Sequence, residues 1–192
     1  MKYRLILASQ SPRRRQLLAG LDIPFEVRVL PDVDERYPAD TPLADIAACI
    51  AEGKARAYSH QLADDEVLLT ADTVVICGNE VLGKPRDAAD ARRMLHALSG
   101  RTHQVVTGVC LLTTRQHRSF SVQTDVTFRP RTAAEIDCDI TRDRPYDKAG
   151  AYGIQEWIGY VGVTRLEGSY FNVMGLPVQR IYSELQALFL AF

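Results

Sequence analysis

The chain has 192 residues, a formal net charge of -1, 46% hydrophobic residues and 24% charged residues. These values are typical of a globular protein, and the lack of an overall basic excess argues against stable binding to nucleic acid. The length is sufficient for one sizeable core, so we expect a single domain over residues 1–192, with two lobes.

The four cysteines lie far apart in the sequence, without a CxxC pair or a histidine at metal-ligand spacing. This pattern favours reduced thiols in a cytoplasmic protein over a disulfide framework or a zinc site. The apolar segment near the N-terminus is too short for a signal peptide, and we find no apolar run long enough to span a bilayer, so no membrane association is expected. The cysteines are Cys49, Cys77, Cys110 and Cys138.

The N-terminal segment predicts a buried strand at residues 3–8 followed directly by a helix. Ser11 is a good N-cap, Pro12 suits the first helical position, and Gly20 is a suitable stop signal. Three arginines, at residues 13–15, lie in the first turn of this helix. Cations oppose the helix dipole there unless an anion binds between them.

Two interpretations of this basic turn are open. It is either a solvated basic surface or a phosphate site, and we favour the phosphate site. Ser9 and Ser11 supply hydroxyl donors beside Arg13 and Arg14, and guanidinium groups bind phosphate with two parallel hydrogen bonds.

The next segment alternates apolar and polar residues over 23–30, as in a half-exposed strand, and an acidic loop follows. Asp32, Asp34 and Glu35 in this loop fit either a solvated turn or a site for a hard cation, and composition favours the turn. Thr41 and Pro42 then predict the start of a helix that carries Lys54.

The most informative stretch is Val67–Ile76, which reads VLLTADTVVI and predicts a buried strand. Asp72 interrupts it, and a buried carboxylate is costly unless a cation, a metal ion or hydrogen bonds pair with it. The alternative is that the strand ends early and Asp72 caps a turn. The strand alone does not decide between the two.

The second half of the chain continues the mixed pattern. A turn at Gly78–Glu80 predicts a hairpin that returns Lys84 near the level of Asp72. The segment Asp147–Gln155 is rich in small residues, which allows a close approach of the backbone to another group. The other predicted elements are helices from Asp87 to Ser99, from Thr132 to about Ile140 with a capping box to Glu135, and from Pro177 onward, and strands at Val105–Thr113, Ser119–Phe128 and Tyr160–Leu166.

Three features converge: a cationic helix N-terminus, acidic residues on separate segments, and scattered lysines. Phosphoanhydride hydrolysis needs this combination, because cations neutralise phosphate oxygens while carboxylates hold a divalent metal and activate water. The sequence has no GxxxxGK[ST] phosphate loop and no GxSxG nucleophile motif, so those two routes are disfavoured.

Eight segments in register resemble the Maf family of nucleoside triphosphate pyrophosphatases. The resemblance implies an α/β fold of the inosine triphosphatase-like type, with an extended mixed sheet, flanking helices and a central cleft. It also implies a homodimer, a magnesium or manganese ion, and cleavage between the α and β phosphates. The segments are SQSPRR (9–14), VDE (33–35), KA (54–55), ADT (71–73), GKP (83–85), LSGRTHQVVTG (98–108), DKAGAYGIQ (147–155) and GSYFNVMGLP (168–177).

Carried over residue by residue, the resemblance implies roles for ten side chains. Asp72 matches the catalytic proton acceptor, and Glu35 matches a second carboxylate that, with Asp72, would hold the metal. The phosphate-binding residues implied are Ser9, Arg13, Arg14, Lys54, Lys84 and Lys148, and the residues implied to set base specificity are Arg13, Thr73 and Gln155.

The specificity positions resemble the branch that hydrolyses dTTP and UTP. A neutral amide and a hydroxyl suit a pyrimidine edge, whereas an acidic residue suits the cationic base of 7-methyl-GTP. We therefore expect a dTTP/UTP pyrophosphatase, with modified pyrimidine triphosphates as further substrates. Two alternatives remain: a 7-methyl-GTP pyrophosphatase, and a nucleotide-binding regulator of septum formation that has no activity.

Overall fold

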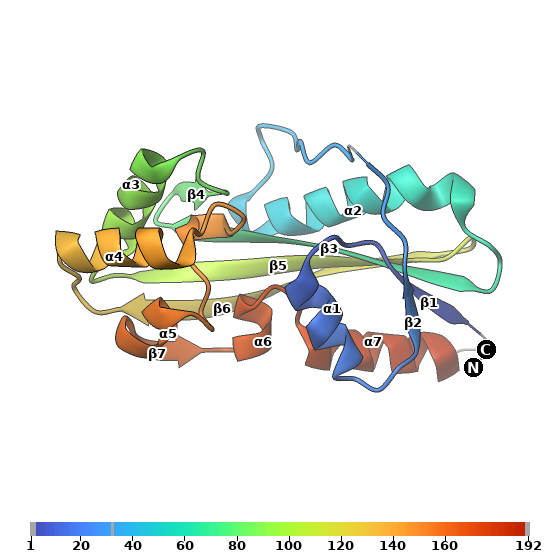
Figure 1. Cartoon of the computed structure of the whole chain (residues 1–192). Coiled ribbons are helices and arrows are strands. Elements are labelled where there is room, and N and C mark those ends of the chain that lie inside the picture. Colours follow the sequence, from blue (N-terminus) through green and yellow to red (C-terminus); the bar gives the residue numbers. More distant parts are fainter. Residues whose placement is uncertain (1–2, 32, 191–192) are drawn as a thin grey trace. The chain divides into compact units, whose positions relative to one another are not determined.

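The computed structural model describes residues 3–31 and 33–190, which form a mixed α/β structure (Figure 1). The strands are β1 (Arg4–Leu7), β2 (Phe25–Val27), β3 (Glu66–Cys77), β4 (Glu80–Leu82), β5 (Thr102–Leu112), β6 (His117–Phe128) and β7 (Val163–Glu167). The α-helices are α1 (Pro12–Ala19), α2 (Ile46–Tyr58), α3 (Ala88–Leu98), α4 (Ala133–Asp143), α5 (Trp157–Val161), α6 (Tyr170–Val173) and α7 (Val178–Leu190).

The strands form a seven-stranded sheet with the order β2-β1-β3-β5-β6-β7, and β4 pairs with β3. The β1 strand pairs in parallel with β2 and β3, whereas β3–β4 and β6–β7 are antiparallel. This mixed sheet with helices confirms the predicted fold class. Parallel pairing needs a long crossover, and α1 and α2 supply the crossovers on either side of β2.

The chain divides into two compact units. Unit 1 comprises residues 1–72, 107–122 and 175–192, and unit 2 comprises residues 73–106 and 123–174. Each unit has its own apolar core. The strands β3, β5 and β6 each contribute residues to both units. The single domain and the central cleft remain predictions.

Within unit 1, α2 lies on one face of the sheet, and α1 and α7 lie on the other (Figure 1). The approach of α2 to β5 depends on Gly108, because a Cβ atom there would lie 2.1 Å from the backbone nitrogen of Ala48. Thr70 adds a hydrogen bond from its Oγ1 to the carbonyl oxygen of Ala51, at 2.7 Å. The sheet and α2 are therefore in direct backbone contact beside Asp72.

Local signals predicted several element boundaries well. The α1 helix begins at Pro12, its N-cap Ser11 accepts a hydrogen bond from the Arg14 backbone, and Gly20 is its C-cap. The capping box of Thr132 and Glu135 is present at the start of α4. The predicted hairpin is also confirmed, because β3 and β4 pair around the turn with Val75 opposite Leu82.

Other boundaries were wrong. The strand predicted over 23–30 is formed only by Phe25–Val27, and α2 begins at Ile46, after a short 3-10 helix at Leu43–Asp45. Tyr160 lies in α5 rather than in a strand, because a helical turn precedes β7. The short helix α6 was not predicted. No helix in the described part of the chain is long and apolar enough to cross a membrane.

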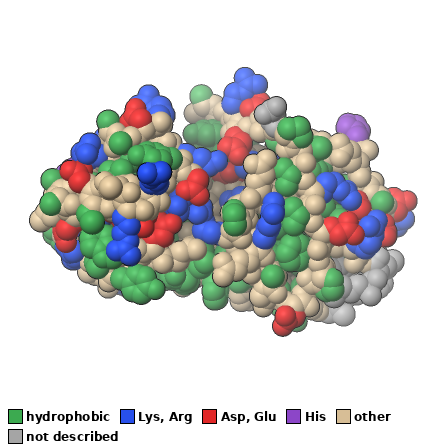
Figure 2. Space-filling model, viewed as in Figure 1, with side chains coloured by type: hydrophobic (Ala, Val, Ile, Leu, Met, Phe, Trp, Pro, Cys, Tyr) green, Lys and Arg blue, Asp and Glu red, His purple; other side chains and the backbone are tan. Residues whose placement is uncertain are grey.

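Acidic and basic side chains are interspersed over the face of the molecule seen in Figure 2, in keeping with the small net charge. All four cysteines are free thiols; Cys77 and Cys110 are buried, and Cys138 is exposed. Burial raises the pKa of the Cys110 thiol to about 12, so this thiol stays protonated at neutral pH.

Candidate functional site

The β3 strand runs without interruption through Asp72, so the alternative in which the strand ends early is wrong. The side chain of Asp72 is 16% exposed, and its Oδ1 atom lies 2.7 Å from Nζ of Lys54. Thr70 and Asp72 are two residues apart on a strand, so both face α2, which carries Lys54 one turn beyond Ala51. The costly carboxylate is therefore paired with a cation from the neighbouring helix.

A second carboxylate meets the same ammonium group. Glu35 Oε1 lies 2.7 Å from Lys54 Nζ, and the Lys54 side chain is 14% exposed. Lys54 thus stands between Glu35, on the loop before α2, and Asp72, on β3. We call these three residues the carboxylate–lysine cluster. Two carboxylates converging on a cation in a partly buried place create a local field that favours positive charge.

The remainder of the acidic loop is a local turn. Asp34 accepts hydrogen bonds from the backbone and the side chain of Arg36, which lower the pKa of the Asp34 carboxyl. Asp32 lies outside the described residues. Across the residues that the structure describes, no group of three or more Asp, Glu, His and Cys side chains is placed to hold a metal ion. Any metal at Glu35 and Asp72 would therefore rely on two protein carboxylates.

The arginines of the first turn have different environments. Arg14 donates from Nε to the carbonyl oxygen of Gly175 at 2.9 Å, and from Nη1 to that of Ala71 at 2.8 Å. We call this pair of contacts the carbonyl clamp. Burial lowers the pKa of the Arg14 guanidinium, and the negative charges of Asp72 and Glu35 oppose this effect. Two donors of Arg14 are thus engaged by backbone carbonyl groups, one of them on the residue next to Asp72.

Ser9 and the other two arginines complete this turn. Ser9 is buried and its Oγ accepts a hydrogen bond from the backbone nitrogen of Ser11 at 3.2 Å. Arg15 is exposed, and its Nε lies 3.4 Å from the carbonyl oxygen of Ser9. Arg13 is partly buried. Ser9, Arg13 and Arg14 are therefore brought into one turn of unit 1, in the unit that also contains the carboxylate–lysine cluster.

Unit 2 contains a second charged group, around Lys148. This lysine side chain is 9% exposed, and its Nζ lies 2.9 Å from both Asp147 Oδ1 and Glu156 Oε1. The backbone nearby has left-handed conformations at Gly150 (φ +69°) and Ala151 (φ +59°). A Cβ atom at Gly150 would lie 2.9 Å from Val75, so the small residues allow the close approach that the sequence predicted.

The remaining sequence-predicted residues also lie in unit 2. Gln155 has a buried Oε1 atom that lacks a hydrogen-bond partner in the described part of the chain. A buried amide oxygen without a partner costs free energy until a donor reaches it. Thr73 is partly buried on β3. Lys84 lies two residues past the end of β4, whose last residue, Leu82, pairs with Val75.

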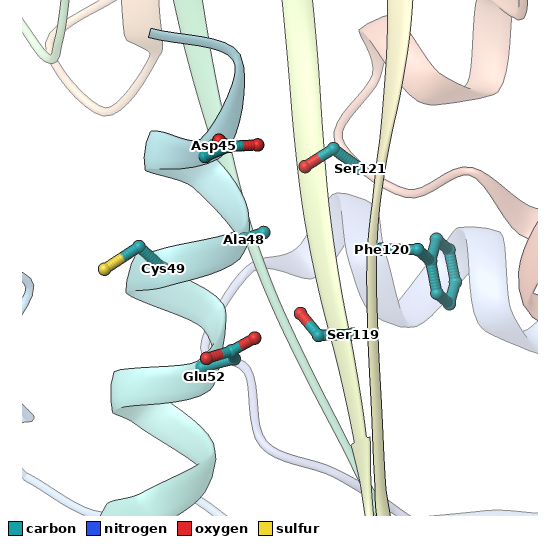
Figure 3. A pocket seen from close by; sticks show the side chains of 7 residues that line it. All are labelled: Asp45, Ala48, Cys49, Glu52, Ser119, Phe120 and Ser121. Atoms are coloured by element: carbon teal, nitrogen blue, oxygen red, sulfur yellow. The ribbon is translucent and has the colours of Figure 1, made fainter. Parts of the chain in front are cut away.

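A groove of about 310 Å³ lies elsewhere in unit 1, between α2 and β6 (Figure 3). Its lining includes Asp45, the N-cap of α2, Glu52 from α2, and Ser119 and Ser121 from β6. None of the ten residues for which the family resemblance implies a role lines this groove.

Comparison with known proteins places these residues in a family. The model of the family described as Maf-like protein matches residues 4–188. The chain belongs to the Maf-like protein family. The predicted family resemblance is therefore confirmed, and it covers nearly the whole chain.

Curated relatives of this Maf-like protein share about half of its residues. A protein of Parabacteroides distasonis named dTTP/UTP pyrophosphatase is 54% identical over 185 residues, covering 96% of both chains. Proteins with the same name from Phocaeicola vulgatus and Porphyromonas gingivalis are 54% and 53% identical over 187 residues; the alignments cover 97% and 96% of this chain and 97% and 94% of the relatives. A solved dITP/XTP pyrophosphatase from Mycobacterium abscessus has a TM-score of 0.45 at 13% identity, covers 98% of this chain and 97% of its own, and is too distant to carry an argument.

Sequence reasoning missed one charged residue of this Maf-like protein: Glu156. It directly follows the recognised DKAGAYGIQ segment, and its carboxylate contacts Lys148. The pair of glycines in that segment was a usable signal. Gly150 approaches Val75, and Gly153 approaches the Glu156 carboxylate. Glu156, the residue that Gly153 approaches, was not apparent as its partner because both lie on the same loop.

Proposed function

We propose that this Maf-like protein hydrolyses dTTP and UTP to the nucleoside monophosphate and pyrophosphate. The observation that carries the reaction is the carboxylate–lysine cluster, in which Asp72 and Glu35 converge on Lys54 at 2.7 Å. The names of the relatives, at 53–54% identity over nearly the full chain, support the substrates.

In this proposal Asp72 is the general base. A water oxygen forms a bond to the α phosphorus, the bond from that phosphorus to the bridging oxygen breaks, and pyrophosphate leaves. Asp72 accepts the proton of the water. Lys54 orients the Asp72 carboxylate, because its ammonium lies 2.7 Å from Oδ1.

We propose Glu35 and Asp72 as the ligands of a divalent metal, magnesium or manganese. Two observations support a metal at this place. Carboxylate oxygens are suitable ligands for these ions, and the Lys54 ammonium already occupies a cation position between the two carboxylates. Magnesium is commonly bound by one or two carboxylates together with waters and substrate phosphates, so two protein ligands suffice. When bound, the metal would supply charge neutralisation for the phosphate oxygens.

We assign phosphate binding to one hydroxyl group and five basic side chains. Ser9, Arg13, Arg14 and Lys54 belong to unit 1, and Lys84 and Lys148 belong to unit 2. Arg14 is the least direct of these ligands, because Nε and Nη1 already donate to carbonyl oxygens. We assign to it the additional role of holding the backbone next to Asp72.

The base would be read by Arg13, Thr73 and Gln155. The buried, unpartnered Oε1 atom of Gln155 supports a base that presents a donor. Uracil and thymine each present one N–H donor between two carbonyl acceptors, so this N–H would satisfy Gln155. The same acceptor would be served less well by cytosine, whose ring nitrogen at that position is itself an acceptor.

The test is a pyrophosphate-release assay with purified protein, magnesium and a panel of nucleoside triphosphates. We expect dTTP and UTP to be the best substrates and excess EDTA to stop turnover. A preference for 7-methyl-GTP would support the first alternative. Nucleotide binding without release of pyrophosphate would support a regulatory role. Activity that survives excess EDTA would contradict the metal.

Two further proposals accompany this function. The family resemblance supports a homodimer, which sedimentation of the purified protein would test. Four separate free thiols support a cytoplasmic location, which fractionation of cells would test.

A further inference from the structure

Lys148 has two carboxylate partners that differ in burial. Asp147 and Glu156 each lie 2.9 Å from its Nζ, but the Asp147 side chain is 64% exposed and that of Glu156 is 24% exposed. An exposed ion pair competes with water and orients its partner weakly. Glu156 is therefore the partner that can fix the position of a lysine that is itself only 9% exposed.

The loop is shaped to admit the Glu156 carboxylate. A Cβ atom at Gly153 would lie 2.9 Å from both Cδ and Oε2 of Glu156, closer than side chains tolerate. Gly153 has no positive φ, so its backbone conformation is open to any residue. Glycine at this position thus leaves the space that the Glu156 carboxylate occupies, and an added methyl group would displace that carboxylate.

The backbone of the loop brings the two residues together. The Glu156 nitrogen donates to the carbonyl oxygen of Gly153 at 3.0 Å, closing a turn between them. Glu156 is also the N-cap of α5, yet its side chain makes no capping hydrogen bond within the described residues. Its carboxylate is directed to Lys148 instead.

We propose that Glu156 is a positioning residue that holds the Lys148 ammonium for binding the phosphates of the substrate, and that Gly153 provides the space for its carboxylate. This inference rests on the proposed function, in which Lys148 binds phosphate. Glu156 acts only through Lys148 and does not itself contact the nucleotide.

The first test is a double-mutant cycle of Glu156→Gln and Lys148→Met. For each single variant we expect KM for dTTP and the inhibition constant of inorganic pyrophosphate to rise about tenfold, with kcat changed less. In the Lys148→Met background, Glu156→Gln should cause no further change, because the residue through which it acts is gone. Asp147→Asn, which removes the exposed partner, should change KM less than Glu156→Gln.

The second test uses Gly153→Ala, which displaces the carboxylate without changing any charge. We expect it to raise KM for dTTP in the otherwise unchanged protein and to have no further effect in the Glu156→Gln background. If Glu156→Gln does not fold, the KM of Gly153→Ala alone still tests the role of the Glu156 carboxylate. Thermal unfolding of each variant, monitored in parallel, separates a loss of stability from a loss of phosphate binding.

The outcomes separate this inference from the function on which it rests. An unmodified protein that releases no pyrophosphate from dTTP or UTP would contradict the proposed function. Normal turnover with an unchanged KM in both Glu156→Gln and Gly153→Ala would contradict only the role of Glu156. If the increases in KM caused by Glu156→Gln and by Lys148→Met multiply in the double variant, the role of Glu156 is also contradicted.

Discussion

Nζ of Lys54 lies 2.7 Å from Oδ1 of Asp72, joining the helix α2 to the centre of the strand β3. Both side chains are largely buried, at 14% and 16% exposure. This contact accounts for a carboxylate inside an otherwise apolar strand. Any role of Asp72 therefore depends on the charge of Lys54, and a substitution of either residue should affect the other.

Asp72→Asn should reduce the rate of pyrophosphate release by a factor of about 10² to 10⁴, because an amide cannot accept the proton of the attacking water. The amide oxygen can still accept a hydrogen bond from Lys54, so folding should be retained. Stopped assays with dTTP together with a thermal unfolding curve check both statements. A variant that keeps more than a tenth of the activity would rule out Asp72 as the general base.

Lys54→Met should abolish turnover but strengthen the binding of Mn²⁺ in the absence of nucleotide. The variant removes the ammonium that lies 2.7 Å from both Glu35 and Asp72, and a divalent ion can take its place between the two carboxylates. Titration calorimetry with Mn²⁺ measures this effect. The double variant Lys54→Met with Glu35→Gln is the matched control, and it should lose the gain in affinity.

Glu66 is expected to dominate the acid sensitivity of unit 1. Its buried carboxylate accepts two hydrogen bonds from Arg28, at 2.7 and 2.9 Å, and these contacts lower its pKa from 4.5 to about 2. Because the pKa is lower in the folded state, the stabilisation is complete above about pH 4.5 and is lost as the pH falls towards 2.

Glu66→Gln should therefore lower the free energy of unfolding by about 3 kcal/mol at pH 7 and flatten the dependence of stability on pH below 4.5. Urea unfolding at several pH values measures both effects. Glu26→Gln, which removes an exposed partner of Arg4, is the control and should change stability by less than about 1 kcal/mol. Equal effects of the two variants would show that the Arg28 contact contributes little.

Gly108→Ala should destabilise the protein by more than about 3 kcal/mol, because the added Cβ would lie 2.1 Å from the nitrogen of Ala48 and 2.2 Å from the carbonyl carbon of Ala47. Rigid helix backbone cannot move away as a side chain can. Gly83→Ala is the matched control, since no atom lies within 4 Å of its added Cβ, and its stability should stay within about 0.5 kcal/mol. Comparable melting temperatures for the two variants would disprove the close packing of α2 on β5.

Gln155→Glu should lower kcat/KM for dTTP and UTP by at least about tenfold, since it places a negative charge where a neutral acceptor is buried. The loss should be smaller for 7-methyl-GTP, whose base is cationic. Competition assays with pairs of nucleotides measure the ratio directly. An equal loss for all nucleotides would indicate that Gln155 does not contact the base.

The parts of the fold that sequence predicted are those set by local chemistry. The helix caps are formed by residues close together in the sequence, so a short segment is enough to predict them. Examples are Ser11 with Pro12 and Thr132 with Glu135. The shortened strand β2 and the helical turn at Tyr160 depended on packing against distant segments, which a window does not contain.

The same distinction applies to the site. The residue types of Asp72 and Lys54 pointed to phosphate chemistry, but their contact joins residues 18 positions apart, and only the fold reveals it. The sequence assigned phosphate binding to both Arg13 and Arg14, but it did not reveal that Arg14 has two backbone acceptors, 57 and 161 residues away. Glu156 was missed because a glutamate in a loop does not stand out in the sequence, and only the structure shows its contact with Lys148.

The carbonyl clamp has a consequence for biosynthesis. Arg14 is synthesised first, Ala71 follows 57 residues later, and Gly175 follows 161 residues after Arg14. The guanidinium cannot reach both acceptors until Gly175 has been synthesised, so the surroundings of Asp72 are completed only after that point. Nascent chains that stop before Gly175 should therefore lack one of the two carbonyl contacts of Arg14, and we expect them to be inactive.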